Sequence, residues 1–355
     1  MAAAALLRRT VSATVLAPAA LCSSFAAARC LLVRPFPPPH PMASVPPVHL
    51  VLDWDGTTTH HDTLHFLGKI CADHARARSN KQDDAPASWD DIAKAYVDDL
   101  AAHASSYRPA LSQRSTIAEE KAWLASLDLV DARSIRRVED AGIFKGVTAA
   151  AVKSGAVKAV ETGELALRDG WADLLAQATK ITVLSVNWSA AFIRESLRAA
   201  AARDRDAEVL LQAVDRIDIL ANEIDGLDDP HGSSGLLNSC KSNADGESNG
   251  IRTSADKLAN MPTPAKYGGD ALVVYVGDSA TDFEALLAAD VGICIRDEDE
   301  PSSGQRELAE TLARVGVEEH RIKLLAEMPP ADDSAVRVYW AKNLREVALS
   351  LSSYC

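Results

Sequence analysis

Two aspartates stand two positions apart in the segment VLDWDGT, residues 51–57. The apolar run VHLVL before them predicts a buried strand that ends at Asp53. A carboxylate in that position can attack phosphorus and form an aspartyl-phosphate. A second acid, here Asp55, can protonate the leaving oxygen and later activate water. Gly56 lets the chain turn away, and Thr57 can steady the loop or bind phosphate. The alternative is that these aspartates form an acidic turn after the strand and have no catalytic role.

A second pair of aspartates follows another apolar run, in VVYVGDSATD, residues 273–282. Asp278 ends the predicted strand and Asp282 lies one helical turn later, so both can face one cation. Mg2+ prefers oxygen ligands, usually one or two carboxylates completed by water and phosphate oxygens. The alternative is that Asp278 or Ser279 caps the helix that starts near Ala280. Beside the first motif, the pattern favours a magnesium site.

Two further residues are candidates for binding phosphate. Ser185 ends the predicted strand KITVLSV, where its hydroxyl could donate to a phosphate oxygen, although serine often ends strands without a function. Lys257 in TSADKLANM could offset phosphoryl charge, and the helix start around it would hold its side chain. Lys266 is the alternative lysine, in a context rich in Pro and Gly. Asn187 and Trp188 are candidates for substrate contact, and Trp188 could equally belong to the core.

The remaining pattern places these residues in an α/β protein. Short apolar runs predict buried strands at 48–53, 180–186, 216–224, 271–278 and 291–297. Apolar spacings of three and four predict helices throughout 62–178 and in 189–204, 279–290 and 334–351. Residues 227–256, rich in Gly, Ser, Asn and Asp, are interpreted as a flexible surface loop. Alternation of strand and helix after residue 178 predicts a doubly wound parallel sheet with helices on both faces.

Composition and charge narrow the classes of partner. The 355 residues are 47% hydrophobic and 25% charged, which is enough apolar sequence for a buried core. The net charge of −13 argues against nucleic acid as a partner. Residues 11–28 carry no charge, but Pro18 and several serines make them a poor membrane span. The six cysteines include no CxxC pair, which argues against a disulfide framework and a zinc site.

The N-terminal segment differs from the rest of the chain. Residues 1–52 contain four arginines, no acidic residue and many Ala, Ser and Leu, which is typical of an organelle transit peptide. We therefore expect residues 1–46 to be a mitochondrial or other organelle presequence with a Pro-rich linker. A secretory signal and a cytoplasmic protein that starts at Met42 are the alternatives.

The order DxDGT, strand-end serine, lysine and GDxxxD resembles the haloacid dehalogenase-like (HAD) superfamily over roughly residues 48–300. The resemblance implies that Asp53 is the nucleophile and Asp55 the acid/base. It also implies Mg2+ bound by the Asp53 carboxylate, the Asp55 backbone carbonyl and Asp278, with Asp282 ligating or supporting. Ser185 and Lys257 would hold the phosphate. Because the family's dehalogenases lack the second acid, its presence favours phosphoryl transfer.

Two subgroups of the superfamily are more closely similar. The helical segment resembles a C1 cap, which implies a mobile lid of residues 65–170 over a core of residues 47–64 and 171–355. In phosphoserine phosphatase-like members, an acidic residue nine positions after the nucleophile faces the substrate, and that position here is Asp62. The segments VNWSAAFI, ILANEI and YVGDSATDFEALLAADVGI resemble the phosphatase domain of plant and fungal thiamine monophosphate phosphatases.

From these patterns we expect a Mg2+-dependent phosphatase that hydrolyses a small-molecule phosphate monoester, with thiamine monophosphate as the leading substrate. A phosphomutase or another phosphotransferase of the same superfamily is the alternative within enzymes. A binding protein that kept the fold and lost turnover is the alternative from another class. The intact pair of Asp53 and Asp55 counts against it, because a binding protein has no use for both.

Overall fold

A parallel sheet forms the centre of the structure. The computed structural model describes residues 47–78, 89–238, 250–262, 271–327 and 338–352, so the predicted presequence lies outside them. Within these residues, seven parallel strands have the order β3-β2-β1-β6-β7-β9-β8. They are β1 (Val48–Leu52), β2 (Lys180–Leu184), β3 (Asp218–Leu220), β6 (Leu272–Gly277), β7 (Val291–Ile295), β8 (Glu319–Arg321) and β9 (Val338–Ala341). The predicted parallel α/β sheet is confirmed.

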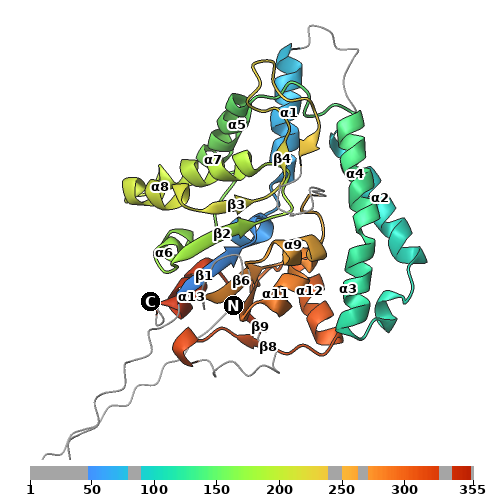
Figure 1. The fold of residues 1–355 in the computed structure, drawn as a ribbon, viewed down its shortest axis with the longest axis vertical. Coiled ribbons are helices and arrows are strands. Elements are labelled where there is room, and N and C mark those ends of the chain that lie inside the picture. Colours follow the sequence, from blue (N-terminus) through green and yellow to red (C-terminus); the bar gives the residue numbers. More distant parts are fainter. Residues whose placement is uncertain (1–46, 79–88, 239–249, 263–270, 328–337, 353–355) are drawn as a thin grey trace, which may run out of the picture. The chain divides into compact units, whose positions relative to one another are not determined.

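Helices connect these strands and cover both sides of the sheet (Figure 1). Those between β1 and β2 are α1 (Leu64–Arg78), α2 (Trp89–Ser106), α3 (Ile117–Ser126), α4 (Asp128–Asp140), α5 (Ala149–Glu161) and α6 (Trp171–Leu175). Those after β2 are α7 (Ala190–Ala201), α8 (Ala207–Asp215), α9 (Ser254–Asn260), α11 (Phe283–Ala288), α12 (Ser303–Arg314) and α13 (Leu344–Leu351). No helix in the described ranges has the length and apolar character needed to cross a membrane.

Both faces of the sheet are apolar, which explains why its strands read as continuous hydrophobic runs. Successive side chains of a strand point to opposite faces. In β1, Leu50 and Leu52 belong to one hydrophobic core and Val51 belongs to the other. The same alternation in β6 places Tyr275 in the core with Val51. The first core includes residues of α5, α7 and α13, and the second includes residues of α11 and α12.

The helices inserted after β1 pack on the core of the protein in two places. Helices α1 and α5 contact each other, and α5 also packs on α7. Helix α3 packs on α9 and lies beside α12 in Figure 1, and α2 packs on α4, which contacts α3. Two ion pairs join this second group to the core, Arg252–Asp128 at 2.6 Å and Arg314–Glu120 at 2.9 Å. Core and insert belong to one compact unit, Val45–Cys355, and the mobility of the predicted lid stays a prediction.

Three predicted elements differ from the structure. Of the helix predicted at 334–351, residues 334–337 lie outside the described ranges. The rest is strand β9 followed by α13, because the apolar run VYWA pairs with β7 and β8 and Asn343 caps the helix after it. The strand predicted at 216–224 is divided into β3 and the short β4 (Glu223–Ile224), which pairs antiparallel with β5 (Leu237–Asn238). The loop predicted at 227–256 contains β5 and the start of α9, and its residues 239–249 lie outside the described ranges.

Candidate active site

The motifs meet where the order of the sheet reverses. From β1 the chain proceeds through β2 to β3 on one side, and later through β6 to β7 on the other. Ligands of open α/β sheets bind at the carboxyl ends of strands beside such a point. Asp53 follows β1 directly, and its backbone N–H donates to Val276 O of β6 at 2.9 Å. Asp278 follows β6 and therefore lies beside it.

Lys257 is the lysine that reaches Asp53. It lies on α9, whose N-cap Thr253 and Asp256 form a capping box that fixes the start of the helix. Its ammonium is fully buried and donates to Asp53 Oδ1 at 2.7 Å and to Asp282 Oδ1 at 2.7 Å. The preference for Lys257 is thus consistent with the geometry, and Lys266 lies outside the described residues.

Asp282 is almost fully occupied by donors within the protein. Besides Lys257, its Oδ1 accepts from the Tyr275 hydroxyl at 2.6 Å. Its Oδ2 accepts from the backbone N–H groups of Asp278 and Ser279, each at 3.0 Å. Of the two roles expected for Asp282, this geometry favours support of the site over ligation of a metal.

Asp278 faces the loop that follows Asp53. Thr57 donates its hydroxyl to Asp278 Oδ1 at 3.0 Å, so this threonine holds the second motif rather than standing free. Gly56 has φ +76°, and a Cβ there would lie 2.4 Å from Asp278 Oδ2. Both the left-handed conformation and the close approach require glycine at this position.

Three buried carboxylates lie together, and one buried ammonium contacts two of them. One oxygen each of Asp53, Asp278 and Asp282 lies within 4.8 Å of the others. Burial and the Asp282 carboxylate raise the pKa of Asp278 to about 7. Burial and the two neighbouring carboxylates also raise the pKa of Asp53, although Lys257 lowers it. For Lys257, burial lowers the pKa, but Asp282 and Asp53 outweigh burial and keep the ammonium charged. The cluster therefore has more negative charge than one lysine can balance, which suits a divalent cation.

Asp55 is held by residues from two other segments. Its Oδ1 accepts from the backbone N–H of Thr63 at 2.7 Å and from the Thr63 hydroxyl at 2.5 Å. Its Oδ2 accepts from Asn187 Nδ2 at 2.9 Å. Burial and the charge of Asp62 raise the pKa of Asp55 to about 6, although Thr63 and Asn187 lower it. A carboxyl group with this pKa can both give and take a proton near neutral pH.

The other predicted residues surround this network at different depths. Ser185 is fully buried at the end of β2, and its Oγ accepts from the Asn187 N–H at 3.0 Å. Asn187 donates its side-chain amide to Asp55, and its predicted contact with substrate stays a prediction. Trp188 is half-buried, with its ring edge-on to Trp89 at 6.0 Å between centroids. Asp62 is exposed and accepts from the Leu64 N–H at the start of α1.

Sequence patterns did not reveal three residues of this network. Tyr275 lies within an apolar strand, and its hydroxyl role depends on the neighbouring Asp282. Thr63 has only its position before α1 as a signal. Arg168 is 1% exposed and donates to the backbone carbonyls of Gly56 and Thr57. Because arginine is usually exposed, nothing in the sequence ALRDG indicates its burial.

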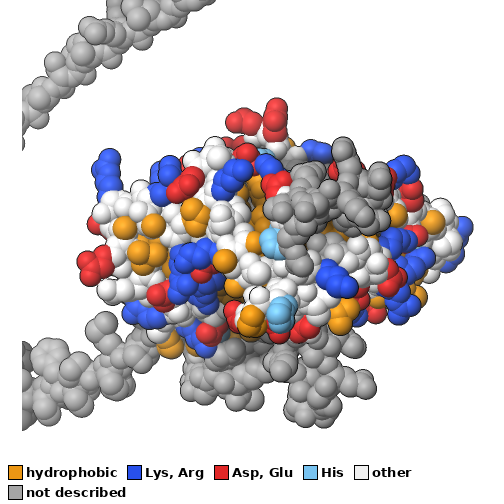
Figure 2. Space-filling model, turned by 90° about the horizontal axis from the view of Figure 1, so that it is seen from above, with side chains coloured by type: hydrophobic (Ala, Val, Ile, Leu, Met, Phe, Trp, Pro, Cys, Tyr) orange, Lys and Arg blue, Asp and Glu red, His pale blue; other side chains and the backbone are white. Residues whose placement is uncertain are grey.

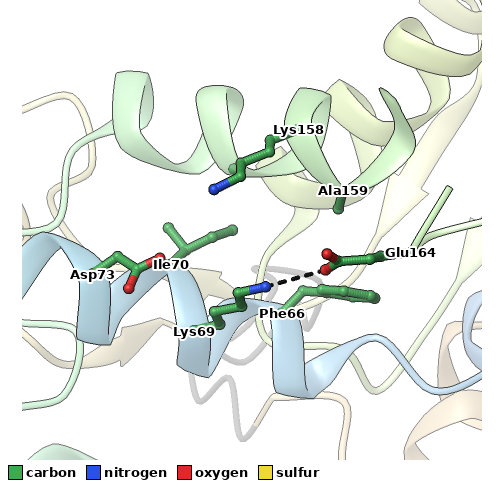
Figure 3. A pocket seen from close by; sticks show the side chains of 8 residues that line it. Phe66, Lys69, Ile70, Asp73, Lys158, Ala159 and Glu164 are labelled. Atoms are coloured by element: carbon green, nitrogen blue, oxygen red, sulfur yellow. Dashed lines mark hydrogen bonds and ion pairs between the residues drawn. The ribbon is translucent and has the colours of Figure 1, made fainter. Parts of the chain in front are cut away.

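Other surface features lie away from the carboxylates. In a pocket lined by α1 and α5, Lys69 and Glu164 are paired at 3.2 Å, as Figure 3 shows. On the face seen in Figure 2, basic and acidic side chains of the described residues are interspersed. Neither feature adds a group to the site around Asp53.

The topology and the motif positions together define the class of fold. The DxDGT motif follows a central strand, the GDxxxD motif follows the adjacent strand, and a helical insert comes after the first motif. This arrangement is consistent with the haloacid dehalogenase-like α/β fold that the resemblance implied.

No family model matches the chain. A CTO1 family protein of Schizosaccharomyces pombe is 27% identical over 259 residues, which cover 69% of this chain and 81% of that protein. A substrate-bound phosphoserine phosphatase structure is 12% identical, with a TM-score of 0.42 and coverage of 85% of this chain and 96% of that one. Cytosolic 5'-nucleotidase IIIB bound to cytidine is 13% identical, with a TM-score of 0.44 and coverage of 86% of each chain.

Proposed function

We propose that this protein is a Mg2+-dependent phosphatase that hydrolyses a small-molecule phosphate monoester through an aspartyl-phosphate on Asp53. The arrangement of Asp53 carries the proposal. Asp53 is buried at the end of the central strand, and its carboxylate accepts a hydrogen bond from Lys257 at 2.7 Å. It lies beside Asp278 and near a second acid, Asp55. A buried carboxylate that is hydrogen-bonded to an ammonium, with a second acid two residues away, is suited to covalent phosphoryl transfer.

The donor set fits magnesium. Asp53 and Asp278 offer carboxylate oxygens, and the loop that follows Asp53 contains the backbone carbonyl of Asp55. These match the oxygen ligands that Mg2+ prefers. The excess negative charge of the cluster supports the same assignment. Bound Mg2+ would neutralise charge on the phosphoryl oxygens.

The residues of the chain would carry out the reaction in two steps. In the first, an Asp53 carboxylate oxygen bonds to phosphorus, the bond from phosphorus to the ester oxygen breaks, and Asp55 gives its proton to the leaving alcohol. In the second, Asp55 takes a proton from water as the water oxygen bonds to phosphorus. The bond from phosphorus to Asp53 then breaks and releases phosphate. Lys257 and Ser185 would hold the phosphoryl oxygens, and Asn187 and Thr63 would orient Asp55.

Thiamine monophosphate is the leading substrate. The support is the resemblance of VNWSAAFI, ILANEI and YVGDSATDFEALLAADVGI to thiamine monophosphate phosphatase domains. The first of these segments includes Asn187, which contacts the acid/base, and the half-buried Trp188 beside it. Trp188 and the exposed Asp62, whose charge acts on Asp55, are the candidates for contacting the alcohol part of the substrate.

Phosphate release from a panel of phosphomonoesters tests the function. The full chain is assayed with and without Mg2+, beside Asp53→Asn, and the panel includes thiamine monophosphate and phosphoserine. We expect Mg2+-dependent release that Asp53→Asn abolishes, with thiamine monophosphate as the fastest substrate. Transfer of the phosphoryl group to a second position of the substrate would indicate a phosphomutase. No turnover by folded, Mg2+-bound protein would favour the binding-protein alternative.

We also propose that residues 1–46 direct the protein to mitochondria or another organelle. The support is their composition, which has four arginines, no acidic residue and many Ala and Leu. A fluorescent fusion of residues 1–46 should reach an organelle, and a fusion that starts at Met42 should stay in the cytoplasm. Secretion of the first fusion would favour a signal peptide.

A further inference from the structure

Arg168 is a buried arginine at the point where the chain leaves the insert. Its side chain is 1% exposed. Its guanidinium contacts Asp297, with Nη1 at 2.5 Å from Oδ1 and Nη2 at 3.3 Å from Oδ2. Gln305 donates to the same Asp297 Oδ2 at 2.9 Å, so α12 fixes the position of this carboxylate. The arginine is thereby anchored to the core beyond β7.

The remaining donors of Arg168 are directed at the loop after Asp53. Nη2 donates to Gly56 O at 2.8 Å, and Nε donates to Thr57 O at 3.2 Å. The backbone N–H of Arg168 donates to Thr58 O at 2.9 Å. Three consecutive carbonyls of the loop are therefore held by one residue.

This loop is the one whose position determines the geometry around Asp278. Gly56 approaches Asp278 so closely that a Cβ there would lie 2.4 Å from Oδ2, and Thr57 donates to Oδ1 of the same residue. A small displacement of the loop would change the distances among the oxygens of Asp53, Asp55 and Asp278.

We propose that Arg168 is a positioning residue for the metal site, which clamps the Gly56 and Thr57 carbonyls against Asp297 so that the loop presents its oxygens to Mg2+. The inference rests on the proposed function, because it assumes that these oxygens bind Mg2+. Only arginine has a planar fork that can reach two carbonyls and a carboxylate at once. Lysine keeps the charge but lacks this fork.

Calorimetric titration of Mg2+ into the substrate-free full chain tests the proposal without relying on turnover. Residues that orient the ligands of a metal typically change affinity by about tenfold to hundredfold. We expect Arg168→Gln to raise the Mg2+ dissociation constant by about tenfold or more. Phosphatase activity of this variant should recover in part at high Mg2+, since the loop can still reach its position when metal is in excess.

Arg114 provides the matched control. It is also a buried arginine of the insert, 5% exposed and paired with Glu120 at 3.0 Å, but it contacts α12 and α3 rather than the site. Arg114→Gln should lower the thermal unfolding temperature and leave the Mg2+ dissociation constant unchanged. Equal loss of Mg2+ affinity in both variants would show a general effect of instability and would overturn the assignment.

Other outcomes distinguish this proposal from the proposed function. Wild-type protein that binds no Mg2+ would overturn the function and this inference together. If the wild-type protein binds Mg2+ and the folded Arg168→Gln variant binds it equally well, the inference about Arg168 is overturned and the proposed function is not. If Arg168→Gln does not fold, Arg168→Lys takes its place, because it keeps the buried charge. It should still weaken Mg2+ binding, and wild-type affinity in that variant would count against the clamp.

Discussion

Removal of the Lys257 ammonium should destabilise the protein strongly, in a way that depends on pH and Mg2+. In Lys257→Met, a side chain of similar length replaces a fully buried cation that lies 2.7 Å from both Asp53 and Asp282. Three buried carboxylates would remain without a positive partner among them. Because these groups are at most 4% exposed, water screens the charges little.

The magnitude follows from the burial of the pair. Removal of one partner of a buried ion pair typically costs about 3–5 kcal/mol, since the other charge stays buried and unpaired. We expect a loss of about 4 kcal/mol in the free energy of unfolding at pH 8 without Mg2+. The aspartate pKa values in the folded variant would be raised further above their unfolded values. The folded state then binds more protons than the unfolded state, so stability falls as pH rises and recovers as pH falls.

Urea unfolding at pH 5.5 and pH 8, with and without Mg2+, measures these effects. The loss should be smaller at pH 5.5, and Mg2+ should restore part of it because a cation that binds only the folded state stabilises that state. Lys94→Met is the control, since Lys94 and Asp98 form an exposed pair with side chains 74% and 64% exposed. A similar small loss in both variants, or an Lys257→Met loss that does not vary with pH, would refute the electrostatic reasoning.

Three further predictions concern other residues of the sheet and the site. His49 is buried in β1, and burial lowers its pKa to about 4. As pH falls below about 6.5, His49 should therefore take up a proton in the unfolded state before it does so in the folded state. This difference should lower the free energy of unfolding by up to about 3 kcal/mol at pH 4. His49→Gln should flatten the stability-versus-pH curve in that window, and an unchanged curve would show that His49 is not the responsible group. Gly56→Ala should abolish Mg2+ binding measured by calorimetry, because its Cβ would overlap Asp278 Oδ2, and wild-type affinity would contradict the close approach. Asn187→Leu removes a hydrogen bond that lowers the pKa of Asp55. The basic limb of the kcat/KM profile should move to higher pH, since Asp55 must hold a proton in the free enzyme, and a shift to lower pH would exclude this role.

Much of the site could be predicted because its chemistry is local in sequence. The pairs Asp53/Asp55 and Asp278/Asp282 each follow an apolar strand directly, so the strand, the turn and the acids form one continuous signal. The carboxyl ends of parallel strands meet at one edge, which allowed two motifs more than 200 residues apart to be placed together. The strand neighbours β1 and β6 are paired in the structure as this reasoning requires.

Residues whose roles depend on distant partners could not be predicted in the same way. The segment ILANEI reads as one strand, but the chain leaves the sheet at Ala221. The side-chain amide of the next residue, Asn222, forms hydrogen bonds with the backbone of Ile251. The run VYWA adjoins a helix, so its apolar residues also fit a helix, and only pairing with β7 and β8 makes it strand β9. Periodicity cannot separate these cases when an apolar run is short.

The sequence by itself determined the class of chemistry, because the types and spacing of carboxylates after two buried strands are a local property of the chain. The tertiary structure decided how those carboxylates are balanced and held. It placed Lys257 between Asp53 and Asp282, and it brought Arg168 under the loop of Gly56. The physical reason is that a lysine or arginine can be buried only where opposite charges and carbonyls from other segments surround it. Packing of the whole fold creates those surroundings.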